Sequence, residues 1–148
     1  MEIDIKRLEE LRTIRKRREE LARLEQVIAA PLLTDFAQLD RMYAEFGALP
    51  MRKRDNRYVI RKQFIFMAVW AFCPCTLIGA RPPKRFRAEL ARVMGLKSPQ
   101  IISEELKDLL FYYTTYQHFR AETDRKYQIV IQALLGQEES RPAEQDGD

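Results

Sequence analysis

Lysine, arginine and hydrogen-bonding side chains gather on both sides of Gly95. Cationic side chains neutralise phosphate groups, and a glutamine amide can bind adenine through two hydrogen bonds. This combination is the chemistry of DNA recognition, and further basic residues lie upstream. The predicted DNA-binding residues are Arg52, Lys53, Arg54, Arg61, Lys84, Arg85, Arg87, Lys97, Ser98 and Gln100.

The sequence contains few residues that could do catalytic chemistry. His118 is its only histidine, and no cysteine or serine lies close to it in sequence. Cys73 and Cys75 are the only cysteines, and with one histidine they cannot complete a tetrahedral zinc site. The two cysteines could form a redox pair, but we favour the alternative that they act as small, buried apolar side chains. We predict no catalytic residues, no metal and no cofactor, and hence no enzyme.

Positive charge is concentrated in the middle of the chain. The net charge is only +4, but residues 50–97 hold 12 Lys/Arg against 2 Asp/Glu. Such a concentration indicates a polyanionic partner. A basic face that is merely solvated is the alternative.

Apolar residues recur at helical intervals, and Gly and Pro are few, which predicts an all-α fold. We expect a helical bundle with a helix-turn-helix, preceded by a long amphipathic N-terminal helix. The expected parts are N-terminal helices over 1–49, a helix-turn-helix domain over 50–136, and a disordered acidic tail over 137–148. The expected helices are 3–29, 35–46, 58–72, 84–94 and 98–135, the last as one helix or two.

The longest uncharged run, residues 64–80, is too short and too interrupted by Pro74 and Gly79 for a comfortable membrane span. We predict a buried helix, with a buried strand as the alternative, and no membrane partner. The N-terminus lacks the basic-then-apolar pattern of a secretion signal. A soluble, cytoplasmic protein is therefore expected.

The N-terminal helix carries one narrow apolar stripe. Such a stripe packs on one partner helix, either the next helix of the chain or a second copy. We therefore include a homodimer, paired as in a coiled coil, among the expected partners. The basic run 15–18 interrupts the stripe, so a strict heptad seam is not predicted across it.

Residues 86–106 predict two short helices joined by a tight turn, in the sequence FRAELARVMGLKSPQIISEEL. Ala91 would allow the helices to cross closely, and Gly95 would supply a backbone with positive φ. Ser98 is a suitable N-cap, and Ile102 would pack into the angle between the helices. This is the physical pattern of a helix-turn-helix, with Lys97, Ser98 and Gln100 opening the recognition helix.

The spacing resembles the C-terminal duplex-binding domain of the replication initiator DnaA family. There, a Gly-Gly-Arg-Asp-His-Thr-Thr-Val run crosses from the turn into the recognition helix. Aligned on Gly95, the run in this chain has the same length, a basic residue at Lys97 and a branched residue at Ile102. The upstream run 61–64 resembles that family's Arg-led helix, and the similarity covers residues 61–110. It implies a helical domain that binds double-stranded DNA. Ser-Pro-Gln replaces the family's Asp-His-Thr, so recognition of its origin box is not implied.

One feature opposes this interpretation. Glu104, Glu105 and Asp108 follow along the supposed recognition helix, and carboxylates repel phosphates. A structural helical hairpin with the same turn chemistry is the alternative. At the level of function, we expect a DNA-binding transcriptional regulator or replication accessory. The alternative is a non-enzymatic helical assembly protein whose basic middle binds an acidic partner.

Overall fold

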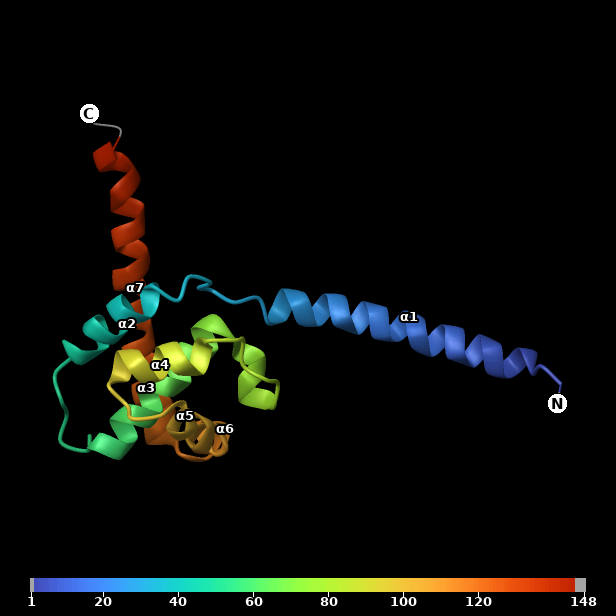
Figure 1. Ribbon diagram of the computed structural model, residues 1–148, viewed down its shortest axis with the longest axis horizontal. Coiled ribbons are helices and arrows are strands. Elements are labelled where there is room, and N and C mark those ends of the chain that lie inside the picture. Colours follow the sequence, from blue (N-terminus) through green and yellow to red (C-terminus); the bar gives the residue numbers. More distant parts are fainter. Residues whose placement is uncertain (1, 146–148) are drawn as a thin grey trace. The chain divides into compact units, whose positions relative to one another are not determined.

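The computed structural model describes residues 2–145, with side chains described up to residue 136. The described part is all-helical and contains no strand, so the predicted all-α class is confirmed (Figure 1). The elements are α1 (Ile5–Ile28), α2 (Gln38–Gly47), α3 (Arg57–Phe72), the 3-10 helix η1 (Pro74–Ile78), α4 (Phe86–Met94), α5 (Pro99–Leu106), α6 (Leu109–Thr115) and α7 (Gln117–Gln145).

The chain divides into two compact units, Met1–Ala30 and Pro31–Asp148. The first unit contains the predicted N-terminal helix, α1. Asp4 caps it, because the Asp4 carboxylate accepts hydrogen bonds from the backbone N–H groups of Lys6 and Arg7. α2, which we had grouped with this N-terminal segment, belongs instead to the second unit, where it packs against α7 and α4.

The predicted buried helix is α3, and it lies at the centre of the second unit. Phe64, Ile65 and Met67 are completely buried, and α3 contacts α2, α5, α7 and η1. Its first turn is fixed by Asn56, whose side chain accepts a hydrogen bond from the Val59 N–H at 3.0 Å. The strand alternative is therefore wrong, because helical neighbours surround this run. Among the described residues, no helix is both long enough and apolar enough to cross a bilayer.

The segment expected as one or two helices over 98–135 forms three. The backbone turns at Lys107 and Asp108, and again at Tyr116, which is extended with φ −101° and ψ 107°. α7 then continues past residue 135 to Gln145. The predicted disordered tail, 137–148, falls on residues whose side chains lie outside the description, and 146–148 lie outside it entirely.

Candidate nucleic-acid interface

The bend between α4 and α5 is held by capping interactions on both sides. Gly95 adopts the left-handed conformation, with φ +69°, and the Leu96 N–H donates to the Ala91 carbonyl at 2.8 Å. Beyond the turn, Ser98 Oγ accepts a hydrogen bond from the Gln100 N–H at 3.1 Å, and Pro99 occupies the first helical position. These local contacts end one helix and begin the next within a few residues.

The inner side of the bend is apolar. Leu90 and Ile102 are fully buried and Ala91 is nearly so. α4 and α5 pack directly on each other, and α5 also packs on α3. The outer side of α4 is tied to α2, because Arg92 Nη2 lies 3.0 Å from Asp40 Oδ2. Burial on one side of the helix pair leaves the opposite side of α5 exposed.

The basic residues before α4 are exposed and close to α5. Lys84, Arg85 and Arg87 are all exposed. Arg87 Nη1 donates a hydrogen bond to Ser103 Oγ at 2.5 Å, which brings the first turn of α4 to the middle of α5. The structure thus brings together residues from the two sides of the bend.

Arg85 has an unusual backbone conformation. Its φ is +71°, and among the described residues it is the only non-glycine with positive φ. For an L-residue with a Cβ, this region costs about 1–2 kcal/mol. Arg85 holds this conformation at the N-cap of α4, where the N–H groups of a helix are unsatisfied. The Arg85 side chain makes no capping hydrogen bond to α4.

The exposed side of α5 presents polar side chains at helical spacing. Gln100, Glu104 and Lys107 are exposed, and Ser103 is partly so. The Gln100 side-chain amide donates to Glu104 Oε1 at 3.3 Å. Lys97 is exposed in the turn, whereas the Ser98 hydroxyl is occupied as the N-cap. Sequence reasoning missed Ser103 and Lys107, although both share the helical face of Gln100, three and seven residues further on.

The acidic residues that opposed a DNA-binding interpretation are neutralised. Glu105 is buried against α3, with Arg61 Nη2 at 2.7 Å and Lys62 Nζ at 2.6 Å. Lys62 also lies 3.2 Å from Asp108. Burial lowers the pKa of Lys62, but its hydrogen bonds to the two carboxylates outweigh burial, and the pKa is raised.

Glu104 is the acidic residue of this group that stays on the exposed face. Its carboxylate lies 3.1 Å from Lys107 Nζ, and this hydrogen bond lowers the pKa of Glu104. The pair keeps the local net charge near zero. Of the three carboxylates, Glu105 is thus buried, and the exposed Glu104 and half-exposed Asp108 are each ion-paired.

The predicted residues of the loop before α3 have a different environment. Lys53 and Arg54 are exposed. Arg52, however, lies 2.8 Å from Glu122 of α7, and the nearby Asp55 lies 3.3 Å from Lys126 of the same helix. These contacts anchor the loop on α7. Arg61, as described above, is paired with Glu105.

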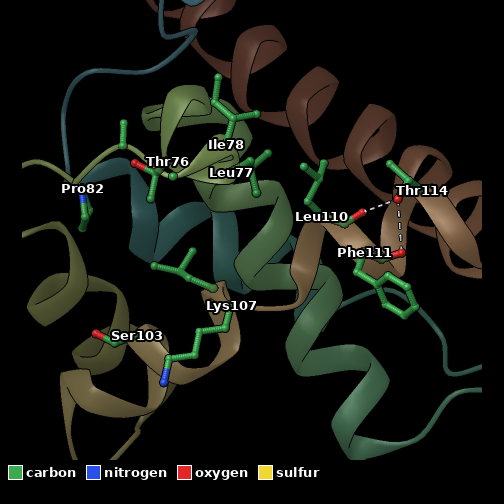
Figure 2. Close-up of a pocket in the computed structure, with 12 residues that line it drawn as sticks. Thr76, Leu77, Ile78, Pro82, Ser103, Lys107, Leu110, Phe111 and Thr114 are labelled. Carbon is green, nitrogen blue, oxygen red and sulfur yellow. Dashed lines mark hydrogen bonds between the residues drawn. The ribbon is translucent and has the colours of Figure 1, made fainter.

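A hollow of about 750 Å³ opens beside α5 (Figure 2). Ser103 and Lys107 lie on one wall, and Thr76, Leu77 and Ile78 of η1 lie on another (Figure 2). Leu106 and Leu110 add apolar surface. The hollow extends the exposed face of α5 towards α6, so a large ligand lying on α5 would find a concave surface there.

The cysteines and the histidine do not form a site. Cys73 and Cys75 are half-buried and not bonded to each other, and burial raises the pKa of the Cys73 thiol. A raised pKa makes a thiol less reactive. His118 is exposed near the start of α7. Within the described residues, no group of three or more potential metal ligands comes together.

No protein-family model, curated protein or solved structure matches the chain. The function is therefore argued from the geometry of this surface.

Proposed function

We propose that the protein binds double-stranded DNA through α4, the turn at Gly95 and α5, used as a helix-turn-helix. The observation that carries the proposal is the bond between Arg87 and Ser103, because it brings the basic start of α4 beside the exposed face of α5. In this arrangement α5 is the recognition helix, lying in the major groove, and α4 crosses the backbone. The cellular role would be that of a transcriptional regulator or a replication accessory.

The roles follow from position and chemistry. Lys84, Arg85 and Arg87 would neutralise phosphates beside α4, and Lys97 would do so at the start of α5. Gln100 would read a base edge, with adenine as the best bidentate partner. Ser98 would contribute indirectly, because its side chain is the N-cap that fixes the first turn of α5.

The two basic segments contribute unequally in this proposal. Arg61 and Arg52 have carboxylate partners, so their charge is partly compensated. Lys53 and Arg54 are exposed and available for a more distant phosphate. The residues around α4 and α5 therefore form the primary contact, and the loop before α3 is secondary.

A gel-shift series at several salt concentrations tests the proposal. Duplex binding should weaken steeply as salt rises, because bound phosphates release counterions. A protein that instead binds an acidic protein partner would not shift duplex DNA at moderate salt. Absence of a shift at low salt would reject DNA binding and favour the assembly-protein alternative.

We further propose that two copies pair through α1. Taken by itself, α1 buries none of its 24 residues (Ile5–Ile28), and its apolar stripe, which includes Leu21 and Leu24, is exposed. Dimeric helix-turn-helix proteins bind two half-sites of duplex DNA. Sedimentation of the full chain should show a dimer, and Leu21→Glu with Leu24→Glu should yield a monomer. A wild-type monomer at all concentrations tested would refute this pairing.

A further inference from the structure

A second hollow, away from the predicted DNA residues, has the size of a small-molecule site. It measures about 460 Å³ and lies between α3, η1, α6 and α7; we call it the α3–α7 pocket. Small-molecule sites typically measure roughly 300–1,000 Å³ and are mostly apolar with a few polar groups. None of the DNA-binding residues predicted from the sequence lines it.

The apolar part of the α3–α7 pocket is largely aromatic. Phe66 and Trp70 come from α3, and the Phe66 ring stacks on Tyr113 of α6, with ring centroids 4.4 Å apart. Trp70 is 49% exposed, although its neighbours on both sides in α3 are buried. A large aromatic side chain in this position presents a flat apolar surface to anything that enters.

The polar groups lie together on one side, along α7. Thr123, Asp124 and Gln128 line the pocket there. Thr123 is only 1% exposed, and its Oγ1 has no hydrogen-bond partner among the described residues. The hydroxyl is enclosed by protein, so the polar side chains that a ligand can reach on this side are those of Asp124 and Gln128.

The charge of the pocket limits the ligand class. Of the described residues that line it, Asp124 alone is charged. Asp124 Oδ1 accepts a hydrogen bond from the Tyr113 hydroxyl at 2.7 Å, which leaves a second carboxylate oxygen. A carboxylate beside aromatic rings favours a cation, since aromatic faces also attract positive charge.

We propose that the α3–α7 pocket binds a small apolar molecule with a protonated amine at one end. The apolar body lies against Phe66 and Trp70. The ammonium group donates a hydrogen bond to the Asp124 carboxylate. The same carboxylate disfavours a fatty acid or another apolar anion. This inference is independent of DNA binding.

Three matched probes test the ligand class: 4-phenylbutylamine, 4-phenylbutan-1-ol and 4-phenylbutyrate. They share one apolar body and differ in the charge of the head. Trp70 is the only tryptophan of the chain, so its fluorescence reports binding in the full-length protein. We expect the amine to bind about tenfold more tightly than the acid, given the modest strength of exposed ion pairs.

Two variants assign the contacts. Asp124→Asn keeps an acceptor for Tyr113 but removes the charge, and should reduce the preference for amine over acid to about twofold or less. Asp35→Asn is the matched control, because Asp35 is also exposed and its carboxylate accepts a hydrogen bond from the Ala37 N–H, outside the pocket. It should leave the preference for amine over acid unchanged.

Equal binding of the three probes, no response of Trp70 to the amine, or an unchanged preference in Asp124→Asn would overturn the proposal. A dimer in which Trp70 is shielded, and which Ile78→Asp dissociates, would identify a second copy as the occupant and would also overturn it.

Discussion

Under the proposed function, neutralising the three basic residues at the start of α4 should remove most of the salt dependence of duplex binding. The change is Lys84→Gln, Arg85→Gln and Arg87→Gln. All three side chains are exposed, and the partner of Arg87 is a neutral hydroxyl, so their charge is available to phosphates. Glutamine keeps length and polarity, so the variant tests charge rather than packing.

The expected magnitude follows from counterion release. Arg92 is exposed but paired with Asp40 and Glu89, which leaves four exposed cations around the bend: Lys84, Arg85, Arg87 and Lys97. Four phosphate contacts give a slope of log K against log salt of about −3.6. Affinity should then fall by roughly 150-fold between about 50 mM and about 200 mM salt. With one contact left, the slope becomes about −0.9 and the loss roughly 3.5-fold.

Fluorescence anisotropy with a labelled duplex, measured at four or more salt concentrations, gives both slopes. The matched control removes the same number of charges from α1, through Lys6→Gln, Arg12→Gln and Arg23→Gln. That control should keep the wild-type slope if the cations near α4 are the phosphate contacts. Equal slopes for the wild type and the α4 variant would refute the assignment, even if the protein binds DNA.

Three further predictions concern stability, each measured by urea unfolding. Gly95→Ala should lower the free energy of unfolding by about 1 kcal/mol, because alanine disfavours positive φ while its Cβ would meet nothing within 4 Å. Gly47→Ala is the control, because its Cβ also has open space, and it should not lower the free energy of unfolding. Equal effects of the two substitutions would contradict the backbone explanation. Glu105→Gln should cost about 2 kcal/mol, because two partly buried cations of α3 lose their carboxylate; an effect near zero would show that the ion pairs are not formed in solution. The pKa of Glu122 is lowered from its ordinary value of 4.5, chiefly by the hydrogen bond from Arg125, so the unfolded state binds more protons and stability should fall as pH drops below about 4.5. Glu122→Gln should flatten this part of the pH profile, and an unchanged profile would refute the role of Glu122.

The sequence predicted those features that depend on neighbouring residues. Gly95, Ser98 and Pro99 determine the bend between α4 and α5 by local capping, and the structure places the bend where the sequence indicates it. The apolar run of α3 was also recognisable, because helical segments flank it. The break at Tyr116 carries no Gly or Pro, so the sequence does not decide between one helix and two over this segment.

Features that depend on distant residues were not predictable in this way. The sequence indicates Glu105 as an exposed acid on the proposed recognition helix, but α3 supplies two cations to it across more than 40 positions of sequence. Arg52 looked available to a phosphate, but Glu122 lies beside it in the fold. Periodicity identifies a helical face; it does not identify the element that this face meets. The same holds for α2, whose place beside α7 and α4 depends on tertiary packing.

Arg85 shows how stability and function would compete in this protein. Glycine would adopt its positive φ without the steric cost that an arginine meets there. The fold is therefore less stable with arginine than it would be with glycine, and the difference stems from a single side chain. Selection for thermal stability would therefore favour replacement of this arginine. Under the proposed function, the same selection would yield variants with lower affinity for DNA.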